Sequence, residues 1–507
     1  MSSKGKSTGV SRRDVLAGAT AVGAMFLPSR VLGRGGAMAP SEKMNVGVVG
    51  IGTRGGFDLK EIANLQHNIV AVCDVDWRTA KGREYAAAYE TAAGFPNAKR
   101  YSDWRIMLQE QDKALDAVLV ATADHSHAVI ALHAMKMGKH VFTEKPLCHT
   151  IEEARLMMAY EKKYKVTTQT GCQGHSSEDC RMLVERVKDG MIGDVREVHL
   201  FQSPPRRTPR GAPQAANGAP PRRARSYEDM IEAVKQEHPI DSELNWDVWI
   251  GPAPYRNFNP MYTPIAWRNW QEFGEGNIGD YCCHSFDPVF WSLDLTLPEQ
   301  VVAQPDMAFD PAANDQTWPF SGNVRWDFPA RGKMPPVSIF WHYGQDSGHI
   351  PLPKGWDPKE DLPTAGGGII YGSQGAVVFG PIFASLPLTA STGAYKPVTW
   401  GTPTKIRYFP EELEKTYKVK KPLNLPRPFN HWADWLDSAK AGKPAGAGFS
   451  YGGLMTETAL VGVIGFSQPG KLLRYNPAAG KFINNDEANA ARLMKRVAYR
   501  KGFELPT

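Results

Sequence analysis

Residues 44–55 read MNVGVVGIGTRG, an apolar run followed by glycines in the pattern G-x-G-x-x-G. The run from 44 to 49 has the composition of a buried parallel strand. Gly50 then permits a tight turn, Gly52 lets the backbone approach a pyrophosphate, and Gly55 lets the following helix pack closely on the strand. The stretch predicts the dinucleotide-binding turn of a Rossmann fold, with the diphosphate at the helix N-terminus. The alternative is a glycine-rich surface turn.

A second apolar run, residues 68–72, leads to Cys73 and Asp74. Asp74 follows the last glycine by about twenty residues, which is where a ribose-binding carboxylate belongs. Such a carboxylate would accept hydrogen bonds from the ribose hydroxyls and repel a 2'-phosphate, so the sequence predicts NAD as the cofactor. The positive charges of Arg54 and Arg78 weaken the preference for NAD, so NADP remains an alternative cofactor. An ordinary aspartate at the end of a strand is the other interpretation.

Predicted strands and helices alternate after the glycine turn and indicate an α/β fold with a doubly wound parallel sheet. The expected elements are a polar helix around 80–92, a strand over 116–122, a helix over 128–137 and a strand over 140–143. Thr150 and Glu153 form a capping box that opens a helix over 151–163. We expect the Rossmann domain to cover residues 43–165.

The pattern changes to longer strands and loops after residue 195. Strands are predicted over 195–201 and 337–343, with a hairpin over 368–378. Their arrangement predicts an α+β second domain, residues 166–507, with a large, mostly antiparallel open sheet. No internal repeat is evident.

The charge of the chain is concentrated at its N-terminus. The 507 residues are 42% hydrophobic, which is enough to form two hydrophobic cores. The fold therefore does not require metal ions or disulfide bonds for stability. The formal net charge is +6, but residues 1–39 hold six basic side chains and one acidic side chain, Asp14. The remainder is close to +1, which argues against a nucleic-acid partner.

Residues 11–16 read SRRDVL and precede a weakly apolar stretch, 15–27, that is too short to span a bilayer stably. This segment resembles a twin-arginine signal peptide. We therefore expect residues 1–39 to direct export of the folded protein to the periplasm by the twin-arginine machinery, with a disordered basic tail as the alternative. A protein exported in this way should keep a tightly bound nucleotide, because little free nucleotide is present outside the cytoplasm.

Two further features are assigned from composition. The six cysteines do not have the spacing of a disulfide-bonded framework, so we interpret them as buried thiols. The alternative is a strained vicinal disulfide between Cys282 and Cys283. Residues 204–225 form a Pro/Gly/Ala-rich insert with six arginines and no acid. Its default interpretation is a solvated loop, and the alternatives are an oligomer contact or a lid over an anionic substrate.

Several motifs together resemble the Gfo/Idh/MocA oxidoreductases, a family that includes glucose-fructose oxidoreductase and inositol dehydrogenase. The resemblance covers essentially everything after residue 43. Its motifs, besides the glycine turn, are ADHSH (123–127), GKHV (138–141), EKP (144–146), QGH (173–175), WIGPAP (249–254), GDYCCH (279–284) and YRKGF (499–503). The resemblance implies a homo-oligomer that associates through the open face of the second sheet.

The family implies that Lys145 is the catalytic lysine and that Asp280 and His284 are the acid-base pair of the second domain. Physical reasoning agrees, because a lysine at the carboxyl end of a parallel strand points into the cofactor crevice and a histidine can take a hydroxyl proton. The i,i+4 spacing of Asp280 and His284 would place both on one helix face, and Pro288 would kink or restart that helix.

The cofactor-binding residues are expected around the glycine turn and the ends of the later strands. They are Gly50, Gly52, Thr53, Arg54, Gly55, Asp74, Arg78, Thr122, His125, His127, Glu144 and Lys145. The sequence departs from the family pattern at two positions. Ala123 replaces a usual proline, and Cys283 replaces a frequent glycine. We expect a looser loop beside the nicotinamide and a bulkier pocket floor.

Two alternatives concern the chemistry of the pocket. Asp280, His284 and Cys283 are candidate metal ligands, but no fourth ligand stands at a recognised spacing, so no metal is expected. The tryptophans near this pair would suit stacking on a pyranose face, although core packing is the more frequent role. They are Trp246, Trp249, Trp267, Trp270 and Trp291.

The sequence therefore predicts an exported NAD(P)-dependent oxidoreductase that acts on a sugar, polyol or glycoside hydroxyl. One alternative is an NAD-dependent glycosidase that oxidises the sugar transiently and eliminates the aglycone. The other is a sugar-binding protein with an inactive site, against which the intact Lys145, Asp280 and His284 argue.

Overall fold

The computed structural model describes residues 38–78, 88–202, 226–344, 347–363, 365–382, 406–421 and 423–507. The twin-arginine motif and the insert 204–225 lie outside these residues. The same is true of most of the helix predicted around 80–92, of which α3 (Ala88–Ala93) is described. No helix in the described residues is long and apolar enough to cross a membrane.

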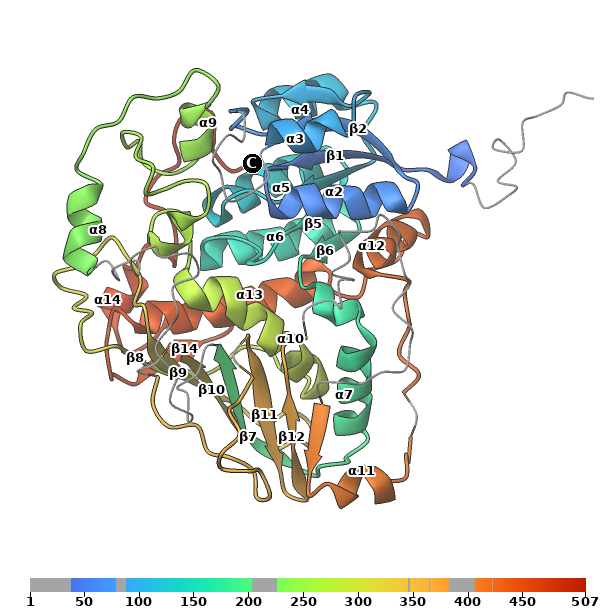
Figure 1. Cartoon of the computed structure of the whole chain (residues 1–507), viewed down its shortest axis with the longest axis vertical. Helices are drawn as coiled ribbons and strands as arrows, with labels where there is room; N and C mark the ends of the chain where they lie inside the picture. The colour runs from blue at the N-terminus through green and yellow to red at the C-terminus, as the bar shows by residue number, and fades with distance from the viewer. Residues whose placement is uncertain are drawn as a thin grey trace, which may run out of the picture.

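The first sheet is parallel and doubly wound, as predicted (Figure 1). Its order is β3-β2-β1-β4-β5-β6, and the six strands are β1 (Asn45–Val49), β2 (Asn68–Cys73), β3 (Lys99–Tyr101), β4 (Ala117–Val120), β5 (His140–Thr143) and β6 (Thr168–Thr170). Sequence analysis did not predict β3 and β6, because each is a three-residue strand with mostly polar side chains. Since β6 pairs in parallel with β5, the sheet continues beyond the boundary predicted at residue 165.

The helices of this domain are α2 (Arg54–Asn64), α4 (Trp104–Gln111), α5 (Asp124–Lys136) and α6 (Ile151–Tyr164). The predicted capping box opens α6, since the Thr150 hydroxyl accepts from the Glu153 N–H at 3.1 Å and the Glu153 carboxylate accepts from the Thr150 N–H at 3.1 Å. Helix α5 begins four residues before its predicted start. Its first turn is polar yet buried, so the apolar pattern could not reveal it.

Segments from the second half of the chain complete the first domain. Helix α12 (His431–Lys440) packs Trp432 and Trp435 into the core that contains β1 and α2. Phe503, near the C-terminus, is buried in the core that contains α4 and α5. The two domains therefore interleave along the chain, which a division by sequence position cannot express.

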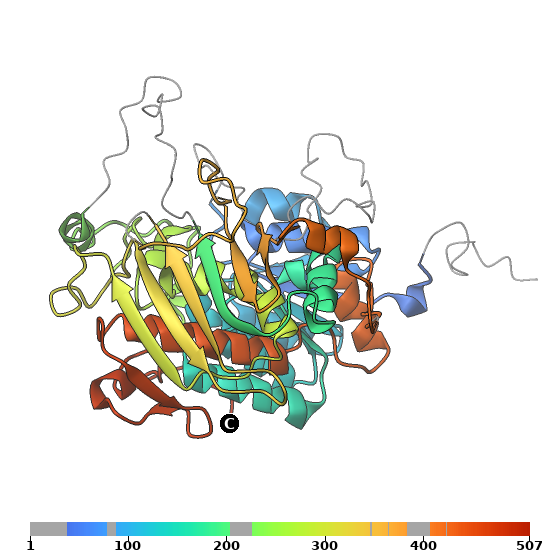
Figure 2. The same ribbon diagram turned by 90° about the horizontal axis from the view of Figure 1, so that it is seen from below.

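The second sheet has nine strands in the order β13-β12-β11-β7-β10-β9-β8-β14-β15, and Figure 2 shows them as a twisted layer. They are β7 (Val195–Gln202), β8 (Gln300–Pro305), β9 (Gly322–Phe328), β10 (Val337–Tyr343), β11 (Gly367–Gly372), β12 (Gly375–Phe379), β13 (Ile406–Phe409), β14 (Leu473–Asn476) and β15 (Lys481–Phe482). Only β7 and β10 pair in parallel, so the mostly antiparallel prediction is confirmed. Association through its outer face stays a prediction.

Helices cover the inner face of this sheet and separate it from the first one (Figure 1). They are α7 (Glu178–Lys188), α10 (Cys283–Ser292) and α13 (Phe449–Gly465). The shorter helices of this half are α8 (Tyr227–Ala233), α9 (Trp246–Ile250), α11 (Glu412–Thr416) and α14 (Asp486–Asn489).

The helix does not restart at Pro288, because α10 runs through this residue, and a kink there stays a prediction. Proline removes one backbone donor from the helix, but burial of Phe286, Val289 and Phe290 in the sheet core holds the helix together. The irregular turn lies before α10, where residues 278–282 form a π-helix, η6. This π-helix carries Asp280, and α10 carries His284.

Candidate functional site

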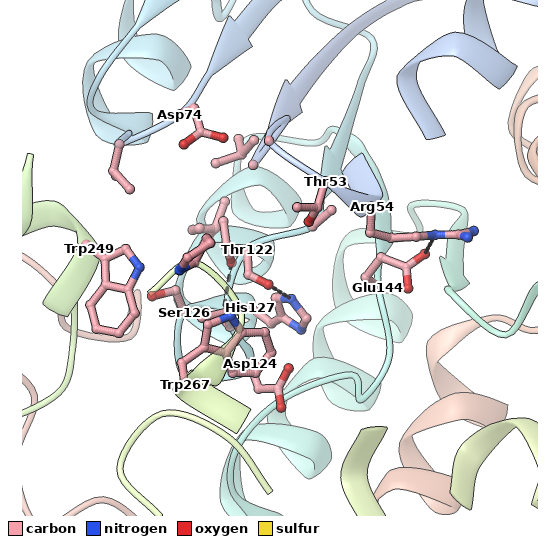
Figure 3. Close-up of a pocket in the computed structure, with 18 of the residues that line it drawn as sticks. Thr53, Arg54, Asp74, Thr122, Asp124, Ser126, His127, Glu144, Trp249 and Trp267 are labelled. Atoms are coloured by element: carbon pink, nitrogen blue, oxygen red, sulfur yellow. Dashed lines mark hydrogen bonds and ion pairs between the residues drawn. The ribbon is translucent and has the colours of Figure 1, made fainter. Parts of the chain in front are cut away.

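A cavity of about 370 Å³ lies at the carboxyl edge of the parallel sheet, where the strand order reverses between β1 and β4. This edge is the usual ligand-binding place in doubly wound sheets. Gly50, Gly52, Thr53 and Asp74 line the part beside β1 and β2. In Figure 3, Asp74 and Trp267 lie at opposite ends of the lining. Lys145, His284 and Arg268 line the same cavity from β5 and the second domain.

The glycine turn meets the steric demands of a dinucleotide site. Gly50 has φ +83°, a conformation that side-chain-bearing residues rarely adopt. A Cβ at Gly55 would overlap the carbonyl oxygen of Gly50 and lie 2.9 Å from the Cβ of Ala121. Thr53 is the N-cap of α2, and none of its side-chain atoms caps the helix. The free N–H groups of the first turn are therefore suited to a diphosphate.

Asp74 lies at the end of β2 and is held by the glycine turn. Its Oδ2 accepts from the Ile51 N–H at 2.7 Å, and its Oδ1 accepts from the Asp76 N–H at 3.0 Å. Burial raises the pKa of Asp74 to about 6, although these backbone donors oppose the rise. The carboxylate lines the cavity as predicted and is oriented before a ribose binds.

Three predicted cofactor residues are not among the residues that line the cavity, namely Gly55, whose role is the close packing described above, Arg78 and His125. Arg78 is held by Asp76, with Nε–Oδ1 and Nη2–Oδ2 distances of 2.8 Å. His125 is buried beneath the site, where its ring nitrogens lie 3.0 Å from the carbonyl oxygen of Trp249 and 3.3 Å from that of Phe273. Burial lowers the pKa of His125 to about 3, so it is a neutral structural residue. Sequence position alone could not show which way either side chain points.

Arg54 and Glu144 line the cavity and bind each other (Figure 3). The Arg54 Nε lies 3.2 Å from the Glu144 Oε1, and its Nη2 lies 3.0 Å from Asp58. Glu144 also accepts from the side chain of Gln173, a residue that was not predicted as part of the site. The charge of Arg54 is thus partly neutralised by the protein, which weakens the argument for NADP.

Thr122 and His127 occupy the predicted position beside β4. His127 lies 2.8 Å from the carbonyl oxygen of Pro146 and 3.0 Å from that of Thr122. Burial lowers the pKa of His127 despite these two acceptors. The imidazole therefore links the loop after β4 to the residue that follows Lys145.

Lys145 and Asp280 are brought together from segments that are 135 residues apart. The Lys145 Nζ donates to the Asp280 Oδ1 at 2.5 Å and to the Asp280 carbonyl oxygen at 2.6 Å. Burial alone would lower the pKa of Lys145, but the carboxylate raises it above its usual value. Burial likewise opposes ionisation of Asp280, but Lys145 and Arg268 hold the pKa of Asp280 below its usual range. This is a buried, ionised pair.

His284 lines the same cavity, from the first turn of α10. Burial is the main cause that lowers the pKa of His284 well below its usual value, and the nearby charge of Lys145 adds to it. The imidazole is therefore neutral and able to accept a proton. The predicted catalytic residues thus meet at one end of the cavity, with Asp280 behind Lys145 and Arg268.

Sequence reasoning missed three residues here, namely Arg268, Asp124 and Gln173. Arg268 lies 3.1 Å from the Asp280 Oδ1 through its Nε. Asp124, the first residue of α5, lines the cavity, and burial raises its pKa well above the usual value. Asp124 and Gln173 belong to quoted family motifs, which was a usable signal. Arg268 carried none, because it lies in a tryptophan-rich loop.

Four of the five tryptophans, Trp246, Trp249, Trp267 and Trp270, belong to one buried aromatic cluster. Of these, Trp249 and Trp267 also line the cavity. Trp291 stacks on His175 with 4.0 Å between ring centroids. The six cysteines are buried thiols, and Cys282 and Cys283 form no disulfide.

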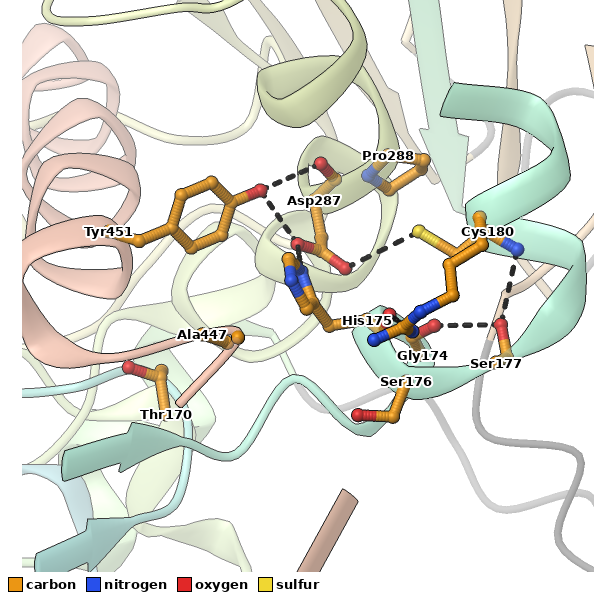
Figure 4. Close-up of polar contacts among 12 residues, drawn as sticks. Thr170, Gly174, His175, Ser176, Ser177, Cys180, Asp287, Pro288, Ala447 and Tyr451 are labelled. Atoms are coloured by element: carbon orange, nitrogen blue, oxygen red, sulfur yellow. Dashed lines mark hydrogen bonds and ion pairs between the residues drawn. The ribbon is translucent and has the colours of Figure 1, made fainter. Parts of the chain in front are cut away.

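A second polar network supports the helix that carries His284 (Figure 4). Asp287, one turn after His284, accepts from Tyr451 at 2.7 Å, and its Oδ1 lies 2.7 Å from the His175 Nδ1. All three side chains are at least half-buried, and His175 and Asp287 are fully buried. The network joins α10 to α13 and to η3 (Gln173–Ser176), the turn that places Gln173 beside Glu144.

Comparison with known proteins assigns both halves of this site. Residues 44–172 match the family model described as the NAD-binding Rossmann fold of the Gfo/Idh/MocA oxidoreductase family. Residues 230–316 match the model of that family's C-terminal alpha/beta domain. The first domain is therefore an NAD-binding Rossmann domain, in agreement with the free helix N-terminus and the glycine that leaves no room for a Cβ.

Curated relatives match about a third of the chain. Inositol 2-dehydrogenase from Salmonella typhimurium is 31% identical over 159 residues, which are 31% of this chain and 45% of that protein. A glycosyl hydrolase family 109 protein from Saccharopolyspora erythraea is 34% identical over 167 residues, which are 32% of this chain and 35% of that protein. The chain thus spans less than half the length of these relatives.

Solved structures match over a longer range. The aldose-aldose oxidoreductase from Caulobacter crescentus aligns with a TM-score of 0.52 and 16% identity, covering 85% of this chain and 99% of the other. The scyllo-inositol dehydrogenase from Lactobacillus casei, solved with NAD(H) and scyllo-inositol, aligns with a TM-score of 0.50 and 15% identity, over 85% and 99% of the two chains. At this identity the likeness concerns the fold.

Replacing Asp74 with serine should raise the affinity for NADP relative to NAD. The change removes the carboxylate that repels a 2'-phosphate and accepts from the ribose hydroxyls, so we expect the ratio of dissociation constants to shift by about tenfold or more. Fluorescence titration with both nucleotides measures this ratio. An unchanged ratio would exclude Asp74 as the ribose contact.

NAD affinity should also depend on pH through Asp74. Because the hydroxyl donors of a ribose favour the ionised carboxylate, affinity should rise as the pH increases through about 6, the pKa of this group, and level off above it. The change should reach at most about tenfold per pH unit. Replacing Asp74 with asparagine should flatten the profile, and a wild-type profile that is already flat between pH 5 and 8 would contradict the assignment.

Proposed function

Given that two regions of the chain match domains of the Gfo/Idh/MocA oxidoreductases, we propose that this protein is an NAD(P)-dependent oxidoreductase that acts on a CH–OH group of a sugar, polyol or glycoside. The observation that carries the proposal is the buried pair of Lys145 and Asp280, which lies beside His284 in the cavity that begins at the glycine turn. Bound NAD would supply the hydride acceptor.

Three residues of the protein carry out the steps other than hydride acceptance. The Lys145 ammonium has three donors, and because Asp280 offers two acceptors, one donor is left for the substrate oxygen. The neutral His284 takes the hydroxyl proton through a ring nitrogen. Asp280 keeps Lys145 charged in a buried site, and this charge stabilises a developing alkoxide.

A glycosidase is the second candidate, because glycosyl hydrolase family 109 proteins are among the relatives that match part of this chain. In that case the same residues would serve a transient oxidation followed by elimination of the aglycone. A binding protein with an inactive site is a weaker candidate, since Lys145, Asp280 and His284 are all present and two of them are in direct contact.

Product analysis separates these candidates. The protein would be incubated with NAD and a set of 4-nitrophenyl glycosides and their free sugars, with a His284→Asn variant as the control. A keto-sugar with NADH formation supports the oxidoreductase, whereas nitrophenol release without net NADH supports the glycosidase. Ligand binding with unchanged substrate in every reaction would reject both enzymes.

We also propose export by the twin-arginine route, on the strength of the SRRDVL motif at residues 11–16. Changing both Arg12 and Arg13 to lysine keeps the charge and removes the motif. Cell fractionation should then find the protein in the cytoplasm, and undiminished export would reject the proposal. If export is correct, the mature protein should carry near-stoichiometric nucleotide, which mass spectrometry of the denatured protein would detect.

A further inference from the structure

Arg268 presents a fixed cation to the catalytic end of the cavity. It lies on a short helix, η5 (Ala266–Asn269), and lines the cavity with Lys145 and His284. Its Nε is 3.1 Å from the Asp280 Oδ1, and its Cζ lies 4.1 Å from the centroid of the Trp267 ring. An ion pair on one edge and an aromatic ring on one face restrain the plane of the guanidinium.

The outer edge of this guanidinium is available to a ligand. Within the described residues, neither Nη1 nor Nη2 of Arg268 has a hydrogen bond to protein, and the side chain is 31% exposed. These two nitrogens point their N–H groups in parallel, a geometry that matches a carboxylate bidentately. An arginine that served only to orient Asp280 would not need an accessible outer edge.

The charges around the cavity end also favour an anion. Lys145 and Arg268 are cations, and Asp280 is the ionised acid between them. Asp124 lines the same region, and burial raises its pKa well above the usual value, which favours its neutral form. Lys145, Arg268 and Asp280 together carry one net positive charge. That balance suits a single carboxylate better than a phosphate dianion.

We propose that the substrate of this site is a sugar acid, whose carboxylate binds Nη1 and Nη2 of Arg268 while its reacting hydroxyl faces Lys145 and His284. In this arrangement the sugar ring would lie against Trp249 and Trp267, which line the same cavity. This inference rests on the proposed oxidoreductase function and specifies the class of its substrate. Arg268 is then a specificity-determining residue.

The test compares matched pairs of acid and neutral sugars on the full chain with NAD. D-glucuronate with D-glucose and D-galacturonate with D-galactose would be used as substrates, with NADH formation as the readout. We expect kcat/KM to be at least tenfold higher for the acid in at least one pair. An Arg268→Met variant should lose this preference, and Arg268→Lys should retain part of it because the charge remains without the paired donors.

Arg407→Met is the matched control. Arg407 also pairs with a carboxylate and lies over a tryptophan, with its Cζ 4.6 Å from the Trp356 ring and its Nη1 2.8 Å from Glu360, but it does not line the cavity. This variant should keep the acid preference. If both arginine variants lose it, the effect comes from the fold and the assignment of Arg268 is wrong.

Direct binding makes the test independent of turnover and of variant folding. Calorimetric titration of the wild-type NAD complex with each sugar should show tighter binding of the acid. Equal kcat/KM and equal affinity within the pairs would overturn the inference while leaving the oxidoreductase intact. If no pair is oxidised, the proposed function fails on these sugars, and tighter acid binding that Arg268→Met abolishes still supports the carboxylate site.

Discussion

Replacing Lys145 with methionine should lower turnover by about a thousandfold while NAD binding is retained. The side chain keeps its length, but the substrate oxygen loses the ammonium that polarises it. Asp280 keeps Arg268 as a cationic partner at 3.1 Å, so its charge remains partly compensated. Single-turnover measurement of NADH formation, with NAD affinity from fluorescence titration, would check both halves of this expectation.

Lys162→Met is the appropriate control for this variant. Lys162 is an exposed residue on α6, the helix that follows the Lys145 segment, and it has no contact with the cavity. Its replacement should leave turnover within twofold of the parent. Hydride transfer by Lys145→Met within tenfold of the parent would remove Lys145 from the mechanism.

Replacing Gly55 with alanine should abolish measurable NAD binding and reduce the free energy of unfolding by about 3 kcal/mol. The new Cβ would overlap the Gly50 carbonyl oxygen, which belongs to the backbone and cannot move aside without shifting the turn. Helix α2 would then be displaced from β1, and its N-terminus would no longer face the diphosphate. Thermal unfolding with and without NAD would report both effects.

Gly94→Ala provides the comparison within the same domain. A Cβ at Gly94 would have the Thr91 carbonyl oxygen as its nearest neighbour at 3.4 Å, an ordinary contact, and Gly94 does not have positive φ. The free energy of unfolding and the NAD affinity should stay close to those of the parent. NAD binding by Gly55→Ala at the parental affinity would contradict the role assigned to the glycine turn.

The reliability of the sequence predictions followed the range of the interactions involved. The glycine turn, the capping box of Thr150 and Glu153, and the hairpin of β11 and β12 are each set by residues close in sequence, and the structure confirms all three. The restart expected at Pro288 is not observed, because packing of α10 in the second core overrides this local rule. The polar first turn of α5 was missed because its burial depends on segments far away in sequence.

The residues of the candidate site show the same difference between local and long-range interactions. A lysine after a parallel strand and a carboxylate after the second strand could be assigned from the sequence, because a parallel strand delivers its next residue to the carboxyl edge of the sheet. Arg78 and His125 were also close in sequence to that edge, yet Asp76 holds one and main-chain carbonyls hold the other. Side-chain direction depends on partners that sequence position does not reveal.

The sequence by itself determined the Rossmann turn, the alternation of strands and helices that follows it, and the identity of Lys145, Asp280 and His284 as candidates. Only the tertiary structure decided that Lys145 donates to Asp280, that Arg268 shares this carboxylate, and that Arg268 lines the cavity. The physical reason is that backbone geometry and helix capping act over a few residues. Charge pairing in a buried site instead depends on contacts between segments more than a hundred residues apart.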